Sequence, residues 1–391
     1  MSDAEYTVSV AADEADLKAL RHEWDELLER SSENRPFSTW TWASCWWDHH
    51  RAGKRLFIVT LRDGEGRLTG LAPFYREWLV PGVPVRRLRL MGAGNSDYLD
   101  LILTRGKEED LAKALVAFLA AHGRAWQLLT LEEVPGDSPA LAAFRSAAAA
   151  AGWPSVLLPQ EVCPYLELPG TWEELRATLG KKTRKHLDYY RRRIEKESQF
   201  EIRLVEDPAA LPAAMAEMFR LHQRRWQRRG MPGSFALPSV RRFHLDVARR
   251  FLDEGRLRLY LAYANGECVA SQYSFRTSAG TFYYSGGFDP AWSWAGVGSL
   301  VVAHSIQRAI AEGLRLFDFL RGAEDYKYRW TSAERRNHQF SAVRPGSGAR
   351  PLLKLLDLQN RAERSKKGRI EAQDGHLAAM GGTCIAQTYR L

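Results

Sequence analysis

The order of helix and strand patterns along the chain occurs twice, and this repeat constrains the fold more than any other feature. Each half reads strand, two helices, hairpin, one or two strands, helix and strand, with almost no identity between the copies. Alternating apolar residues predict the strands, and apolar residues three or four positions apart predict the helices. We therefore expect a mixed α/β fold made of two copies of one unit.

The first copy is predicted within residues 1–168 and the second within 169–345, because Pro and Gly interrupt the pattern at 163–172. The second copy begins with a basic helix or helical pair at 171–197. The polar end, residues 346–391, is predicted to be a peripheral tail with one helix near 352–367. Predicted strands cover 5–10, 55–77 (a hairpin), 86–91, 97–104, 126–134, 153–159, 200–207, 256–276 (a hairpin), 280–289 and 314–320, and predicted helices cover 15–31, 37–47, 108–123, 138–151, 212–230, 239–255 and 298–313.

The net charge of +9 is concentrated in one part of the chain. Residues 181–256 hold 19 Lys or Arg and 10 Asp or Glu, which accounts for the whole excess. A local excess of this kind favours anionic partners. The basic 181–256 segment is therefore a candidate contact for an anionic surface, an anionic substrate or tRNA, although such runs are equally typical of a solvated helix face.

Several classes of protein are excluded. The four cysteines are far apart and form no CxxC pair, so neither a zinc site nor a disulfide framework is expected. His49 and His50 are adjacent and read as a helix end, so we expect no metal. The N-terminus has no signal-peptide pattern, and no apolar run reaches the ~18 residues of a membrane span. The sequence predicts a cytoplasmic protein.

A predicted helix in the second copy is entered through the glycines of SWAGVGS, residues 293–299. The first amides of a helix have no partner within it, and glycine lets an anion approach them closely. We therefore expect a diphosphate such as that of coenzyme A to bind at Ser293, Gly296, Val297, Gly298 and Ser299. The rival glycine run MGAGNSD at 91–97 precedes a strand pattern instead of a helix, which argues against a dinucleotide site.

The stretch LFDFLRGAEDYKYRW, residues 316–330, places many polar groups after a predicted strand. Asp318 lies in an otherwise apolar row, where burial requires an ion pair or a functional role such as proton transfer. In an acyl transfer, Lys327 is a candidate mobile cation for an oxyanion or a phosphate. Glu324 or Asp325 could accept the proton, and Tyr326 or Tyr328 could donate one to a leaving sulfur. A solvated loop is the alternative interpretation.

The segments 219–230 and 280–330 closely resemble a GNAT-like acyltransferase family associated with cellulose or capsule biosynthesis, which is similar in turn to the Fem aminoacyl transferases. The resemblance covers nearly the whole chain except the tail, and Ser293 departs from the Gln or Arg usual in the glycine motif. It implies two tandem GNAT-like domains, the second holding an acyl-CoA, with transfer of an acetyl group as the simplest case. The positions it indicates are Asp318, Gly322, Tyr326 and Lys327, with Arg225 and Trp226 as candidates for the pocket. Tyr284 and Arg321 are further candidates for substrate binding.

The resemblance leaves three functions open. An acyl group can pass from acyl-CoA to an amine or hydroxyl of a sugar, polysaccharide or envelope precursor. Alternatively, an aminoacyl group can pass from aminoacyl-tRNA, as in Fem-type relatives. A non-catalytic binding or scaffold protein is the third alternative. The helix of the first copy that corresponds to 298–313 begins after TRGKEED, which places acids where a phosphate would have to bind.

Overall fold

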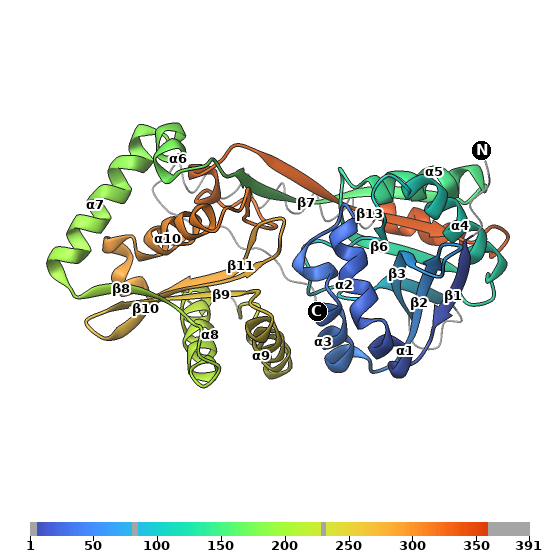
Figure 1. Cartoon of the computed structure of the whole chain (residues 1–391), viewed down its shortest axis with the longest axis horizontal. Helices are drawn as coiled ribbons and strands as arrows, with labels where there is room; N and C mark the ends of the chain where they lie inside the picture. Colours follow the sequence, from blue (N-terminus) through green and yellow to red (C-terminus); the bar gives the residue numbers. More distant parts are fainter. Residues whose placement is uncertain (1–5, 80–84, 228–231, 359–391) are drawn as a thin grey trace. The chain divides into compact units, whose positions relative to one another are not determined.

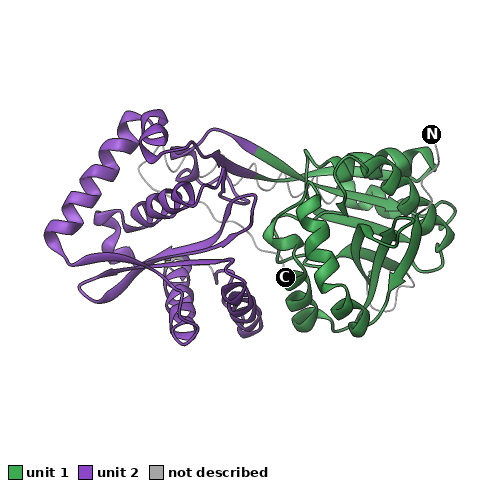
Figure 2. Cartoon of the chain, viewed as in Figure 1, with its two compact units in different colours: residues 1–162, 335–369 green, residues 163–334, 370–391 purple. Residues whose placement is uncertain are grey.

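The computed structural model describes residues 6–79, 85–227 and 232–358, except for the side chain of Arg225. The chain divides into two compact units, each containing strands and helices (Figure 1, Figure 2). Among the described residues, unit 1 consists of those within 6–162 and 335–358, and unit 2 of those within 163–334. The predicted mixed α/β fold with two copies of one pattern is confirmed.

In unit 1 the strands lie in the order β1-β2-β3-β4-β6-β13, with β5 beside β3. All these pairs are antiparallel except β4 with β6, which is parallel. The bounds are β1 Thr7–Ala11, α1 Glu14–Ala19, α2 Arg21–Arg30, η1 Pro36–Ser38, α3 Trp40–His50, β2 Lys54–Arg62, β3 Leu68–Trp78, β4 Arg86–Leu90, β5 Ile102–Leu103, α4 Glu108–Ala121, β6 Leu128–Pro135, α5 Pro139–Ala150 and β7 Ser155–Glu167, the last of which continues into unit 2.

Unit 2 repeats this plan. Its strands lie in the order β7-β12-β11-β10-β9-β8, and again only one pair, β11 with β12, is parallel. The bounds are α6 Trp172–Thr178, α7 Lys181–Glu197, β8 Phe200–Leu204, α8 Leu211–Gln227, α9 Pro238–Asp253, β9 Leu257–Ala264, β10 Glu267–Arg276, β11 Thr281–Phe288, η2 Pro290–Ala295, α10 Val297–Ala311, β12 Leu316–Asp318, η3 Lys327–Arg329 and β13 Glu334–Val343.

The last strand of each predicted copy pairs with a strand of the other unit. β7 ends the first copy and pairs with β12 of unit 2, with Phe317 opposite Leu166. β13 ends the second copy and pairs with β6 of unit 1, with Phe340 opposite Leu131. No sequence pattern predicted β13. Its presence means that each unit is assembled from two separate parts of the chain.

The described part of the C-terminal segment packs on unit 1. Residues 350–358 are helical, and Leu353 is buried in a cluster with Leu128 and Val343. The rest of the predicted tail, 359–391, lies outside the described residues.

The Trp-rich segment is a buried helix that fixes a loop of unit 1. The indole N–H of Trp42 donates to Ser96 Oγ at 2.8 Å, and that of Trp46 donates to Asn95 Oδ1 at 3.2 Å. His49 and His50 lie in the last turn of α3, which confirms the helix-end interpretation. The strand predicted at 97–104 is wrong over most of its length, since only β5 is a strand there and the preceding residues form an irregular loop.

Candidate functional site

The two parallel strands of unit 2 separate at Asp318. β12 pairs with β11 at two positions, Thr281 with Phe317 and Phe282 with Asp318. β11 then continues to Phe288, whereas β12 ends at Asp318. The loop that carries most of the predicted catalytic residues therefore starts where the strands part.

Asp318 is fully buried, and its carboxylate holds the turn that follows β12. Its Oδ1 accepts a hydrogen bond of 2.8 Å from the N–H of Leu320. Leu320 has a φ of +56°, a left-handed conformation that costs a non-glycine residue on the order of 1–3 kcal/mol. A hydrogen bond to a carboxylate offsets part of that cost. Asp318 thus positions this turn, and its predicted proton-transfer role stays a prediction.

Lys327 is buried and binds the backbone of the same loop. Its Nζ donates to the carbonyl oxygens of Leu320, Arg321 and Gly322 at 3.0, 2.7 and 3.1 Å, and lies 3.0 Å from Glu324 Oε2. An ammonium held by four oxygens is fixed in place. The description of Lys327 as a mobile cation is therefore corrected to that of a clamp across residues 320–324, because the loop folds back on the Lys side chain.

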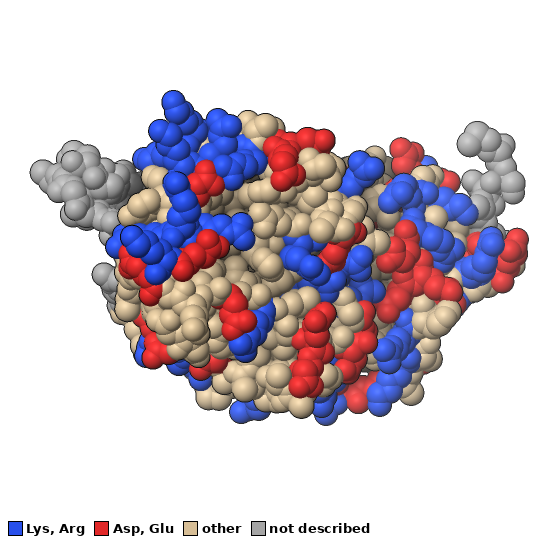
Figure 3. Space-filling view, turned by 60° about the vertical axis from the view of Figure 1, so that its left-hand side comes forward, with Lys and Arg blue, Asp and Glu red and all other residues tan. Residues whose placement is uncertain are grey.

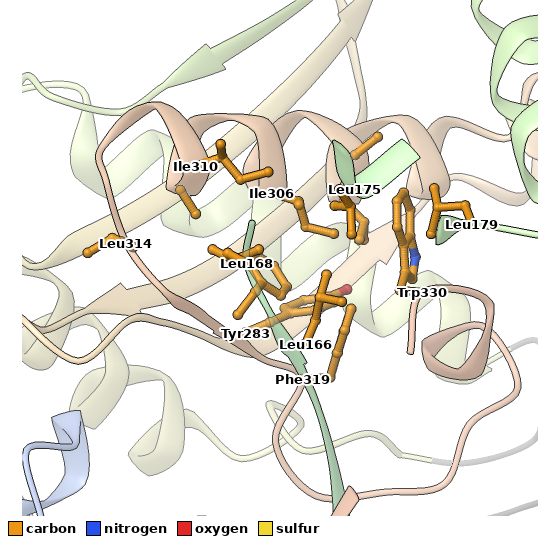
Figure 4. Close-up of a cluster of buried hydrophobic side chains, with 14 of the residues drawn as sticks. Leu166, Leu168, Leu175, Leu179, Tyr283, Ile306, Ile310, Leu314, Phe319 and Trp330 are labelled. Atoms are coloured by element: carbon orange, nitrogen blue, oxygen red, sulfur yellow. The ribbon is translucent and has the colours of Figure 1, made fainter. Parts of the chain in front are cut away.

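The loop is also anchored at its far end. Trp330 is buried in a hydrophobic cluster that includes Ile306 of α10 and Phe319, and Figure 4 shows it beside Leu175 and Leu179. Tyr326 packs against this cluster and is half-buried. Its ring centroid lies 6.3 Å from that of Tyr283 of β11, in an edge-on arrangement. The structure therefore brings six predicted residues into one fixed loop: Asp318, Arg321, Gly322, Glu324, Tyr326 and Lys327.

The predicted phosphate site is the start of α10. Gly296 precedes the helix in a left-handed conformation, with φ 59° and ψ 29°. Its N–H donates to the carbonyl oxygen of Ser293 at 3.2 Å, so this amide is already used. Within the described residues, the N–H groups of Val297 and Gly298 have no hydrogen-bond acceptor. Ser299 donates its N–H to the carbonyl oxygen of Gly296 at 2.9 Å. Two amides are therefore open, where the sequence predicted three, at Gly296, Val297 and Gly298.

The two glycines at this helix start have different surroundings. A Cβ at Gly296 would lie 2.3 Å from the ring of Tyr190 of α7, which is closer than real Cβ contacts. A Cβ at Gly298 would meet only the Phe288 ring, at 3.5 Å, an ordinary contact distance. Gly296 is therefore required by packing and backbone conformation. Packing does not require glycine at position 298. Close approach of a ligand to the amide of Gly298 remains as a reason for glycine there.

The remaining predicted substrate-binding residues lie on the opposite face of β11 from Tyr283. Tyr284 Oη is 3.4 Å from His244 Nε2 of α9, and the Tyr284 ring packs near that of Phe275. Trp226 of α8 is buried beside His222. The candidate residues thus divide between two faces of the sheet. Arg225 lies in α8, and its side chain is outside the described residues.

Unit 1 contains a buried ionic cluster that sequence reasoning missed. Glu33 pairs with Arg35, whose guanidinium lies 4.8 Å from the centroid of the Tyr98 ring. Asp100 is 2% exposed, and its Oδ1 accepts the N–H of Leu101 at 2.7 Å. Within the described residues, Asp100 Oδ2 is buried and accepts no hydrogen bond.

Burial raises the pKa of both carboxyls of this cluster. For Asp100 desolvation is the largest cause, followed by the negative charge of Glu33, and the pKa lies well above its usual range. For Glu33 desolvation raises the pKa against the lowering effect of Arg35. The negative charges of the two carboxyls oppose each other, so they titrate as a pair in which ionisation of both is disfavoured. The only sequence signal was the position of Asp100 inside the apolar run LDLIL.

Basic side chains gather along α7. Figure 3, turned to bring this side forward, shows Lys and Arg concentrated there. Arg191 and Arg193 pair with Glu195 and Glu197 one turn later on the same helix. The four cations of the first turns, Lys181, Lys182, Arg184 and Lys185, have no acidic partner in the part of the chain that the structure describes. Cations at a helix N-terminus oppose its dipole, so a bound anion would relieve an unfavourable arrangement.

Two further findings concern the described residues as a whole. No group of three or more His, Cys, Asp or Glu side chains among them is placed to hold a metal ion. No helix within 6–79, 85–227 or 232–358 is both long and apolar enough to cross a bilayer.

Comparison with known proteins finds one family model that matches part of the second half, and solved structures with a similar fold. Residues 181–328 match the family model described as an acetyltransferase (GNAT) domain. The crystal structure of FemX is similar with a TM-score of 0.64 at 11% identity, covering 86% of this chain and 98% of that one. No curated protein matches the sequence.

Two other solved structures share the fold. A conserved protein of unknown function from Bacteroides thetaiotaomicron gives a TM-score of 0.57 at 11% identity, covering 86% of this chain and 100% of that one. L-PGS from Bacillus licheniformis gives 0.52 at 12% identity, covering 88% and 96%. The chain therefore carries a match to the GNAT acetyltransferase domain over residues 181–328, within an overall fold like that of FemX.

Proposed function

We propose that this protein is an acyltransferase whose unit 2 takes an acyl group, acetyl in the simplest case, from acyl-CoA. The acceptor is an amine or hydroxyl of a sugar, polysaccharide or envelope precursor, and the reaction takes place in the cytoplasm. The GNAT match covers the elements involved, from α7 through η3. The observation that carries the proposal is the pair of open amides at Val297 and Gly298, at the start of the helix that connects the two parting strands.

The start of α10 fits the diphosphate of coenzyme A. Two N–H donors lie at the positive end of the helix dipole, and the absence of a side chain at Gly298 leaves their surroundings open. A backbone amide carries no charge, so this arrangement favours a ligand that brings its own negative charge, as a diphosphate does. Coenzyme A would supply the activated thioester.

The loop after β12 supplies groups for the transfer itself. Asp318 and Lys327 hold the backbone of the loop, which fixes the positions of Glu324 and Tyr326. In our proposal Glu324 takes the proton from the attacking amine or hydroxyl, directly or through water, and Tyr326 donates to the departing sulfur. Fixed geometry of this kind can lower the activation barrier of a bimolecular reaction by roughly 7–11 kcal/mol. General acid–base catalysis can raise the rate about 10²–10⁴-fold.

Gly298→Ala tests the donor site with little risk to the fold. The added methyl group makes an ordinary contact with Phe288, and Ala is favoured over Gly in a helix by about 1 kcal/mol. We expect wild-type protein to be stabilised by ~2.7 kcal/mol at an acetyl-CoA concentration 100 times its Kd, and the variant to lose most of this effect. Gly64→Ala, in an open turn of unit 1, is the matched control. Equal stabilisation of all three proteins would refute the diphosphate assignment.

A second candidate function is aminoacyl transfer from aminoacyl-tRNA. It is favoured by the cations at the start of α7 that have no acidic partner among the described residues and suit RNA phosphates. Salt titration separates the two functions, because RNA binding through several phosphates weakens steeply as salt rises. A binding or scaffold role without chemistry is the outcome if the protein binds acetyl-CoA but transfers nothing to any amine or hydroxyl offered.

A further inference from the structure

One side of α7 carries basic side chains and no acid. Lys181, Lys185, Tyr189, Arg192 and Lys196 follow one another at intervals of three or four residues, which places them along one side of an α-helix. All five side chains are exposed. Figure 3 shows Lys and Arg gathered along this helix. We call these five residues the basic stripe.

The opposite side of α7 holds the basic stripe in solvent. Leu187 and Ile194 are buried in the core of unit 2, and Tyr190 packs against the cluster that contains Ile194. These three residues are also three and four positions apart, so they form a single apolar side of the helix. Turning the basic stripe inward would expose this apolar surface to water, which is unfavourable. The stripe therefore faces outward in the folded protein.

The acids of α7 are matched with cations outside the basic stripe. Each of the three acids pairs with an arginine that is not a member: Asp188 with Arg176 at 2.6 Å, Glu195 with Arg191 at 3.2 Å, and Glu197 with Arg193 at 3.1 Å. Among the residues that the structure describes, the four cations of the stripe form no ion pair. Their charge is therefore not neutralised within the protein.

We propose that the basic stripe docks the protein on an anionic lipid bilayer, with Tyr189 at the level of the headgroups. The stripe runs ~22 Å along the axis of one helix, so a flat anionic surface can meet all its cations at once. Tyr189 is 49% exposed and has an apolar ring with a polar tip, the kind of side chain that is enriched at membrane–water interfaces. The inference concerns α7 alone and does not depend on the proposed reaction.

The residue types of the stripe favour a diffuse anionic surface over nucleic acid. Three of its four cations are lysines, which are compact charges, whereas arginine is the side chain whose planar donors match single phosphates of nucleic acids. The stripe is also a straight ridge, which fits a plane. Each basic residue close to an anionic membrane surface raises partitioning about 5-fold, so four of them together raise it roughly 10²–10³-fold.

Sedimentation of the full chain with lipid vesicles tests the proposal. We expect wild-type protein to bind vesicles with roughly one-third phosphatidylglycerol but not vesicles of phosphatidylcholine alone, and to release as salt rises. The double variant Lys185→Gln with Lys196→Gln should bind the anionic vesicles about 25-fold more weakly. Gln forms helices about as well as Lys, so α7 should persist, which circular dichroism checks. Tyr189→Ala should also weaken binding, whereas Tyr189→Trp should bind at least as tightly as wild type.

The matched control removes the same charge from unit 1. Lys113→Gln with Lys354→Gln replaces two exposed lysines there and should bind the anionic vesicles as wild type does. An equal loss in this control would trace binding to net charge and overturn the inference. Equal binding of wild type to both kinds of vesicle, or no binding to either, would also overturn it. So would a stripe variant that loses binding of unfractionated tRNA but keeps vesicle binding. Acetyl-CoA binding of the stripe variant should equal that of wild type, which keeps failure of the proposed function separate.

Discussion

Replacing Lys327 with Met tests whether the lysine holds the loop or acts on the substrate. The substitution keeps the length and apolar stem of the side chain but removes the ammonium. Three carbonyl oxygens then lose their shared donor, and one Glu324 carboxylate oxygen loses its ion-pair partner. All four oxygens lie within 3.1 Å of Nζ in the wild type. A buried acceptor left without its partner costs free energy of unfolding, because water cannot reach it.

The size of the effect follows from the burial of the two partners. Breaking a buried ion pair by removing one partner costs about 3–5 kcal/mol. The side chain of Glu324 is 35% exposed and can turn toward water, so we expect the lower end, about 3 kcal/mol. For a unit of this size, that corresponds to a fall of about 6–12 °C in the Tm of unit 2.

Thermal unfolding and hydrogen exchange together check this prediction. The Tm should fall, and the amides of residues 320–327 should exchange faster, whereas those of α10 should change less. Lys113→Met is the control, since that lysine is 67% exposed and lies 3.6 Å from Asp110. A Lys327→Met variant with wild-type Tm and exchange but with lost acyl transfer would refute the clamp and support a direct role in the reaction.

Three further predictions follow from contacts in both units. Burial raises the pKa of Asp100 in the folded state. Between the usual carboxyl pKa and this raised value, the folded protein therefore holds a proton that the unfolded chain has released. The free energy of unfolding should fall as pH rises through this range, by up to ~1.4 kcal/mol per pH unit. Asp100→Asn should remove this dependence of Tm on pH, measured from pH 5 to 9. An unchanged slope in the variant would contradict the role given to Asp100. Gly296→Ala should destabilise unit 2 by about 1–3 kcal/mol in urea unfolding, because the φ of Gly296 is positive and an added Cβ would meet Tyr190. Gly298→Ala should not have this effect. Asp318→Asn keeps an acceptor for the N–H of Leu320, so the Tm of this variant should stay near that of the wild type. Loss of turnover would then support a proton-transfer role for Asp318, and full activity would exclude that role.

Much of the fold was predictable because local signals agree with tertiary structure. The hairpin around Asn265 and Gly266 is an example: both residues have positive φ, as the tight primed turn predicted from this dipeptide requires. The glycine entry to α10 was equally clear. β13 was missed because its residues, ERRNHQFSAV, are polar at the start and lack clean alternation. Its pairing with β6 depends on partners about 200 residues away in sequence, which no local pattern reveals.

The candidate site was predictable as a set of residues but not as a geometry. The charge and tyrosine content of residues 320–330 identified the loop. Nothing in the sequence indicated that Lys327 turns back to its own backbone, since a lysine after a strand is compatible with either a free or a bound ammonium. The cluster of Glu33 and Asp100 escaped notice for a related reason. Its members come from separate loops, and only the folded structure shows that they are buried together.

The reciprocal placement of β7 and β13 affects how this protein can be dissected and how it arose. A fragment ending near residue 168 would leave β6 with an unsatisfied edge, and one starting near residue 169 would deprive β12 of a neighbour. Exposed strand edges promote aggregation, so separately expressed halves should be insoluble or should recombine when mixed. A duplicated gene that traded its final strands in this way could no longer lose either copy, which would preserve a first half even after its chemistry had gone.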